Sequence, residues 1–464
     1  MQGRRHPSEG CTASITTPAL AGLEPKMKHT DLLGNPFSEA TEAALEKYAE
    51  ALRQFNCYQG DPVKTIESAV EEAPGFAMGH LMHAWLHLLS TEPEAAAVAR
   101  SDLERVAQLP LNRRERGHAE AVAAFAAGRW HAAGRILEDV SIEYPRDGLA
   151  LQAGHFGDYL RGDSRMLRDR VARVLGRWGP SDPGCHAVIG MFAFGCEETG
   201  DYPRADAFGR RALDLEPGDA WAHHAVAHAF EMQGRSREGI EWMRERQPYW
   251  AEDNFLSVHN WWHWALFHLD LGEIDEVLAL FDGPIHGSRS TVTVDLIDAS
   301  ALLWRLQLLG IDVGSRWETV ARDWCVTARP GLYAFNDFHA TMAWVGSGEG
   351  DRAAQWITAQ TEQTRQDRGD HAAIAEKVGA PLLQALAAFG RGDHAQALAL
   401  LRAVRPIAQR MGGSHAQRDV IDLTMVEAAR RSGHRELARA LVAERVHLKP
   451  DSAYNRALDL RMAA

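Results

Sequence analysis

From residue 38 onward, apolar residues recur at intervals of three and four along almost the whole chain, and alternating β-branched runs are scarce. This period matches one face of an α-helix, so it predicts an almost entirely helical protein. The predicted helices are separated by turns of one form: a glycine, a polar residue, often an aromatic residue, and then an alanine. The clearest turns have the sequences GRWHAA, GDYPRA and GDHAQA, which begin at Gly128, Gly200 and Gly392.

The turn glycines recur at regular intervals along the chain. Weaker copies of the same turn begin at Gly162, Gly234, Gly272, Gly310, Gly350 and Gly433. From the first glycine to the last, the intervals are 34, 38, 34, 38, 38, 40, 42 and 41 residues. A glycine readily ends a helix in the left-handed conformation, and a period of this length accommodates one pair of helices. The sequence therefore predicts one array of about nine helix pairs between residues 38 and 460.

Residues after these glycines resemble the tetratricopeptide repeat. Ala205, Ala212 and Pro217 follow Gly200 by 5, 12 and 17 residues, and alanine and proline follow Gly128 by 5 and 17. Small residues allow the second helix to pack closely, and proline ends it. The resemblance implies an all-α, right-handed superhelix of tetratricopeptide-like helix pairs, an α-solenoid. With about nine repeats, the ends of such a superhelix can approach each other and close around a central cavity.

Longer motifs narrow the resemblance to one family. HNWWHWALFHLDLGEIDEVLALFD at 259–282, FNDFHA at 335–340 and GGSHAQRD at 412–419 resemble the tetratricopeptide repeat protein thirty-eight family. WAHHAVAHAFEMQG at 221–234 and ERVHLKP at 444–450 resemble it too. The likeness spans roughly residues 27–460. It implies a cytoplasmic helical-repeat protein and no particular activity.

Composition limits the partners that we expect. The formal net charge of −13 argues against nucleic acid or an anionic membrane surface as the main partner. The five cysteines are widely spaced without a CxxC motif, which suits a reducing compartment and argues against a disulfide framework. No apolar run approaches 18 residues, so we expect no transmembrane helix.

The first 26 residues differ from the rest. They are rich in Ser, Thr, Pro and Gly and have no helical period, so we expect residues 1–26 to be a disordered extension. No apolar segment follows Arg4 and Arg5, so we expect no secretory signal. Residues 27–464 are then a single repeat array, and Met27 is an alternative start to Met1.

The repeat also predicts which residues face inward. In the tetratricopeptide repeat, the first helix of each pair lines the concave face; with the turn glycine at position 15, positions 2, 5, 9 and 12 point inward. Gly234, Gly272 and Gly350 then select histidines, tryptophans and acids, and GGSHAQRD adds two more polar candidates. We expect these residues to line one concave ligand-binding cavity: Trp221, His224, His228, Glu231, His259, Trp262, His263, Asp337, His339, His415 and Arg418.

Two histidine pairs have the spacing of metal ligands. His224 with His228 and His259 with His263 are each four residues apart on one helix face, and the two helices are neighbours in the predicted array. The four imidazoles could hold zinc or another first-row divalent ion. The segment HNWWH has Asn260 where the HExxH motif has its glutamate, which excludes that metalloprotease mechanism.

Several interpretations remain open. The first is a protein that binds a peptide or small polar ligand in the cavity, and the alternative is an enzyme that uses the same histidines and acids, with or without metal. Each histidine could instead have only a structural hydrogen bond. Arg418 could clamp a ligand carboxylate or form a structural ion pair. The sequence leaves the ligand, the presence of catalysis and the oligomeric state open.

Overall fold

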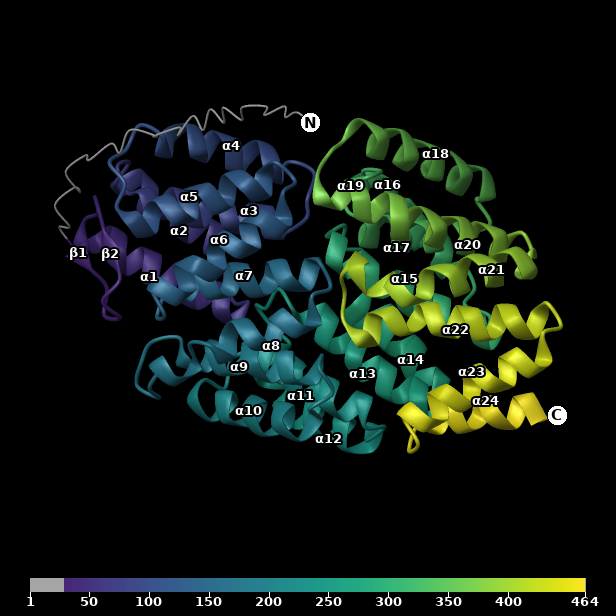
Figure 1. The fold of residues 1–464 in the computed structure, drawn as a ribbon. Coiled ribbons are helices and arrows are strands. Elements are labelled where there is room, and N and C mark those ends of the chain that lie inside the picture. The colour runs from purple at the N-terminus through teal and green to yellow at the C-terminus, as the bar shows by residue number, and fades with distance from the viewer. Residues whose placement is uncertain (1–28, 464) are drawn as a thin grey trace, which may run out of the picture.

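The computed structural model describes residues 29–463, so the predicted disordered extension lies outside the described residues. Apart from a short antiparallel pairing of β1 (His29–Thr30) with β2 (Pro36–Phe37), the regular structure of these residues is helical. Helices that follow each other in sequence pack as pairs, and the pairs stack side by side. The chain is therefore an all-α solenoid of tetratricopeptide-like helix pairs, as the glycine pattern predicts (Figure 1).

The helix pairs within residues 29–463 number eleven. They are α1 (Glu42–Cys57) with α2 (Pro62–Glu72), α3 (Ala77–Leu89) with α4 (Ala95–Val106), α5 (Arg113–Ala126) with α6 (Trp130–Glu143), α7 (Gly148–Leu160) with α8 (Ser164–Ala172), α9 (Cys185–Glu197) with α10 (Tyr202–Leu215), α11 (Ala220–Met232) with α12 (Ser236–Trp250), α13 (Ser257–Leu271) with α14 (Ile274–Leu280), α15 (Thr293–Leu309) with α16 (Arg316–Thr327), α17 (Ala334–Gly346) with α18 (Gly350–Gln366), α20 (Ala380–Gly390) with α21 (His394–Val404), and α22 (His415–Arg431) with α23 (Arg435–Leu448). The short helix α19 (Asp370–Ile374) precedes α20, and α24 (Ala453–Ala463) covers the end of the array.

The two pairs at the N-terminal end were not predicted. The turn between α3 and α4 contains no glycine, and Gly60 in the turn between α1 and α2, with a φ of 63°, was not recognised as a copy of the pattern. Thr91, in the turn between α3 and α4, has a φ of 56°, and Tyr58, at the end of α1, has a φ of 57°. A residue with a Cβ rarely adopts this left-handed conformation. A search based on glycines therefore misses the second pair.

One predicted turn glycine is wrong by two residues. Gly350 is the first residue of α18, and the left-handed residue of that turn is Gly348, with a φ of 80°. The other eight predicted glycines have positive φ. Moving the turn to Gly348 also moves the inward positions of α17, so that the rule selects Phe335 and Phe338 instead of Asp337.

The array closes on itself through hydrogen bonds between segments that are far apart in sequence. The backbone N–H of Asp370 donates to the carbonyl of Gly128 at 2.7 Å, and the hydroxyl of Tyr333 donates to the carbonyl of Leu160 at 2.9 Å. α22, near the C-terminus, contacts both α11 and α15, and α1 contacts α11. In Figure 1, the teal helices α11 and α13 lie between the blue N-terminal helices and the yellow C-terminal helices.

The continuous helix Asp370–Gly390 is long and apolar enough to cross a membrane by length and composition alone, with a mean hydropathy of 1.3. Its most apolar window is 67% buried inside the array, where α20 packs against α17 and α21. Burial in the protein core accounts for this composition.

Candidate metal centre

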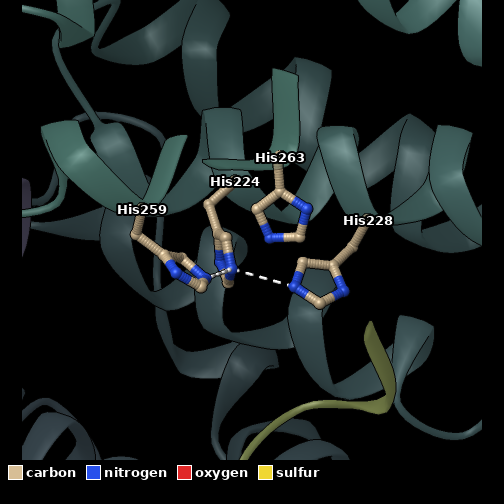
Figure 2. A group of neighbouring side chains, drawn as sticks. All are labelled: His224, His228, His259 and His263. Carbon is tan, nitrogen blue, oxygen red and sulfur yellow. Dashed lines mark hydrogen bonds between the residues drawn. The ribbon is translucent and has the colours of Figure 1, made fainter. Parts of the chain in front are cut away.

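Four histidines from two neighbouring helices meet inside the array. α11 supplies His224 and His228, α13 supplies His259 and His263, and one ring nitrogen from each lies within 4.8 Å of the others. Figure 2 shows the four rings facing one another. The Nε2 atom of His224 lies 2.9 Å from Nε2 of His228 and 3.1 Å from Nε2 of His259. Nitrogens bound to one tetrahedral zinc are about 3.3–3.4 Å apart, given Zn–N bonds of about 2.0–2.1 Å. The four donors are therefore at a separation that a single ion can span after small side-chain movements.

Carboxylates behind two of the rings orient these nitrogens toward the centre. Nδ1 of His259 lies 2.8 Å from Oδ2 of Asp298, and Nδ1 of His263 lies 3.1 Å from Oε2 of Glu231. An ionised carboxylate only accepts hydrogen bonds, so Nδ1 of each ring carries the proton. In a neutral ring, Nε2 then presents its lone pair to the other histidines. Histidines that bind metals are usually oriented by a second hydrogen bond of this kind.

Burial keeps three of the four histidines uncharged. Desolvation, reinforced by the neighbouring imidazoles, holds the pKa of His224 and the pKa of His263 well below the ordinary value. Desolvation also lowers the pKa of His228 to about 3. Metal coordination requires neutral imidazoles, and these rings are neutral at physiological pH without any metal to displace their protons.

Aromatic rings enclose the histidines. The indole of Trp262 stacks on His259 with ring centroids 5.2 Å apart, and the guanidinium of Arg305 lies over that indole. The indole of Trp221 stacks on Tyr58 and lies 4.8 Å from the ring of His224. Both tryptophans are buried, so each forms part of the wall around the four histidines.

Two adjacent carboxylates lie beside His228. Oε2 of Glu197 is 3.5 Å from Nδ1 of His228, and Glu197, Glu198 and His228 bring one donor atom each within 4.8 Å of one another. Desolvation and the charge of Glu198 raise the pKa of Glu197 well above its usual range. Burial opposes ionisation of Glu198 too, but Arg418 and His415 outweigh it and lower the pKa of that carboxyl.

The GGSHAQRD segment connects the C-terminal repeats to these carboxylates. Ser414 caps α22 and forms a capping box with Gln417. The backbone N–H of His415 donates to Oε1 of Glu198 at 2.6 Å, and Nη2 of Arg418 donates to Oε2 of Glu198 at 3.0 Å. Of the two roles left open for Arg418, the structure therefore shows an internal ion pair. Tyr159 also donates to Gln417 at 2.6 Å, so this segment is part of the closure of the array.

The candidates on α17 are not brought to the four histidines. Asp337 is fully buried, and its carboxylate accepts hydrogen bonds from the backbone N–H of Gly331 at 3.1 and 3.2 Å. Burial raises the pKa of Asp337 to about 8. His339 makes its hydrogen bond to the carbonyl of Phe335, within the same helix. The two-residue error at Gly350 explains the selection of Asp337, because the corrected rule gives apolar inward positions.

Two small cavities adjoin the centre. One has a volume of about 410 Å³ and is lined in part by Glu198, His415 and Arg418. The other, of about 50 Å³, is lined in part by Glu231 and Arg305. His259 is the least buried of the four histidines, with 13% of its side chain exposed.

Two residues of this centre were not among those predicted to line the cavity. Glu197 occupies inward position 12 of the repeat that turns at Gly200, so the same rule would have found it. Asp298 is not at an inward position, and its bond to His259 joins α15 to α13. A partner on a different helix leaves no local signal in the sequence.

The comparisons with known proteins concern the fold alone. No protein-family model matches the chain. The structure of the human IFIT1 dimer with m7Gppp-AAAA aligns with 92% of this chain and 96% of its own, at 12% identity and a TM-score of 0.41. Yeast Tom70 aligns with 91% of this chain and 86% of its own, at 12% identity and a TM-score of 0.32. The chain is similar to these proteins, and the likeness is too distant to assign a ligand. The helix pairs themselves define the class as tetratricopeptide-like helical-repeat proteins.

Proposed function

We propose that this helical-repeat protein binds a first-row divalent metal ion, with zinc as the expected ion, through His224, His228, His259 and His263. The observation that carries the proposal is the convergence of four buried ring nitrogens within 4.8 Å. Imidazole is a good ligand for zinc, copper, iron and nickel, and hard ions such as magnesium prefer oxygen donors.

Hydrogen bonds from two of the rings to carboxylates support an ion at this point. His259 donates through Nδ1 to Asp298, and His263 donates through Nδ1 to Glu231. In a neutral ring Nε2 is then an acceptor, and Nε2 of His263 has no hydrogen-bond partner among the described residues. A cation between the rings would give the unpaired Nε2 of His263 a partner.

Burial of the candidate residues favours an ion over a peptide as the primary ligand. His224, His228 and His263 are at most 2% exposed, and Trp262 is fully buried. A peptide would need an open groove, whereas an ion needs only the space between the rings.

Three statements remain predictions of the sequence. They are the assignment to the tetratricopeptide repeat protein thirty-eight family, the cytoplasmic location and the absence of a nucleic-acid partner.

Metal analysis of the purified protein tests the proposal. We expect inductively coupled plasma and native mass spectrometry to find bound zinc or a related ion in the wild type. The double variant His224→Asn/His259→Asn should lose it. His223→Asn is the matched control, because His223 lies on the same helix, is also buried, and bonds to the carbonyl of Pro217 instead. A wild type that stays metal-free after zinc titration would refute the proposal, as would a double variant that keeps the ion.

Metal-assisted chemistry on a small polar ligand is the second candidate function. The cavity of about 410 Å³ beside Glu198 favours it, because an enzyme needs room for a substrate near the ion. Catalytic metal sites keep a coordination position open for water or substrate. Azide added to cobalt-substituted protein should change the visible spectrum if such a position exists. An unchanged spectrum would favour a closed, structural site.

A further inference from the structure

We propose that the centre binds two metal ions: the second divalent cation is held by Glu197, Glu198 and Nδ1 of His228, and His228 bridges it to the first ion. This inference rests on the proposed function, because the first ion is the one held by the four histidines. The carrying observation is that His228 contributes one ring nitrogen to each of two donor groups.

The two ring nitrogens of His228 face different partners. Nε2 lies 2.9 Å from Nε2 of His224, inside the group of four histidines. Nδ1 lies on the other side of the ring, 3.5 Å from Oε2 of Glu197, and has no hydrogen-bond partner among the described residues. His228 is fully buried, so Nδ1 does not face solvent. A ring placed in this way can donate a lone pair to each of two ions.

Glu197 differs from the carboxylates that merely orient their histidines. Asp298 and Glu231 accept hydrogen bonds from His259 and His263 at 2.8 and 3.1 Å. Both carboxylate oxygens of Glu197, by contrast, are buried without a hydrogen-bond partner among residues 29–463. A carboxylate that is taken out of water and left unpaired is costly, so a binding partner is expected there.

Glu198 supplies the second oxygen donor. Its carboxylate already accepts from the backbone of His415, from Arg418 and from the hydroxyl of Ser164, at 2.6, 3.0 and 3.1 Å. A carboxylate has about four acceptor positions. Nδ1 of His415 lies 3.3 Å from Oε1 of Glu198 but makes no hydrogen bond, so the fourth position is open to a cation. Arg418 balances the charge of Glu198, while no cationic side chain bonds to Glu197 within the described part of the chain. A divalent ion between the two carboxylates would balance that remaining charge.

Binding of both ions requires His228 to lose its ring proton. A neutral imidazole has one N–H and one lone pair, so a bridging ring is an imidazolate, and the displaced proton passes to solvent. If Glu197 carries a proton before the ion binds, that proton is released too. Two carboxylate oxygens and one imidazole nitrogen suit a first-row ion such as Zn²⁺ or Mn²⁺.

The stoichiometry of zinc in the full chain tests the inference. Native mass spectrometry of protein titrated with Zn²⁺ should show two ions per chain in the wild type and one in Glu197→Gln, which keeps the shape of the side chain and removes its charge. Glu115→Gln is the matched control. Glu115 is also fully buried, but it is bonded to Ser38 and Asn112, so this variant should bind two ions.

Each outcome decides between the two proposals. One ion in the wild type would overturn the second site and leave the four-histidine site intact, with a proton on Glu197 as its neutralising partner. Two ions in Glu197→Gln would place the second ion elsewhere and also overturn it. No ion in any protein would refute the proposed function itself. If Glu197→Gln does not fold, Mn²⁺ added to wild type that already holds one zinc should give the electron paramagnetic resonance spectrum of bound manganese. A spectrum of free Mn²⁺ only would count against the site.

Discussion

Acid should destabilise the metal-free protein through its buried neutral histidines, and His228 is the sharpest case. Burial lowers the pKa of His228 to about 3 in the folded chain, whereas an unfolded histidine has a pKa of about 6.5. Below pH 6.5 the unfolded chain therefore takes up a proton at this position that the folded chain does not. The free energy of unfolding is therefore unaffected by His228 protonation well above pH 6.5, and it decreases as the pH falls from 6.5 toward 3.

The size of the effect follows from that interval. At pH 5.0 the unfolded histidine is about 1.5 pH units below its pKa, and each unit corresponds to about 1.36 kcal/mol. Between pH 7.5 and 5.0, His228 alone should therefore lower the free energy of unfolding by about 2 kcal/mol. In His228→Asn this contribution is absent. The contributions of His224 and His263 should remain, because burial is the largest cause of their lowered pKa values.

Urea unfolding in excess EDTA, followed by tryptophan fluorescence at both pH values, measures this difference. The variant is expected to be less stable than the wild type at pH 7.5, and the gap should narrow by about 2 kcal/mol at pH 5.0. His434→Asn is the control, because His434 is exposed and its replacement leaves every buried histidine in place, so the pH response of this variant should match the wild type. Equal losses in the wild type and His228→Asn would refute the reasoning, since His228 would then be charged in the folded chain or accessible to water.

Three further outcomes are expected. Chelation should lower the unfolding midpoint of the metal-bound wild type, because an ion at 1,000 times its Kd adds about 4.1 kcal/mol to the free energy of unfolding. The midpoint of His224→Asn/His259→Asn should not change, and equal shifts in the two proteins would contradict this. Arg418→Ala should cost about 3–5 kcal/mol in chemical unfolding, because it leaves Glu198 buried without its cation, whereas Arg165→Ala, at an exposed pair, should cost less than about 1 kcal/mol. Gly348→Ala should lower the free energy of unfolding by about 1–2 kcal/mol because Gly348 has a φ of 80°, and Gly350→Ala should not lower it. If Gly350→Ala were the more destabilising change, the turn would lie at Gly350, as first predicted.

The repeat architecture was predictable because it depends on local signals. A glycine such as Gly272 must end its helix in the left-handed region, so eight of the nine predicted turns appear directly in the sequence. The signal fails where another residue takes that conformation, as Thr91 does, or where two glycines lie two residues apart, as at Gly348 and Gly350. An error of two residues is enough to rotate a helix face, and it produced the selection of Asp337.

The candidate site was predictable only in part. His224, His228, His259 and His263 combine a fixed helical spacing with adjacent repeats, so both the pairs and their proximity follow from the sequence. The ion pair between Glu198 and Arg418 joins residues 220 positions apart, and no periodic pattern determines which distant repeats meet when the array closes.

Closure of the array changes how this chain is expected to unfold. In an open solenoid, each repeat contacts only its neighbours, so the terminal repeats can fray one after another and the protein need not unfold in a single step. Here α22 contacts α11 and α15, and the segment at Asp370 is bonded to Gly128. Repeats that would be free ends in an open array are thereby tied to its middle. Because these contacts join distant parts of the chain, they raise the contact order, which slows folding. Unfolding should accordingly be more cooperative than in an open array of equal length, with one concerted loss of structure in place of gradual fraying.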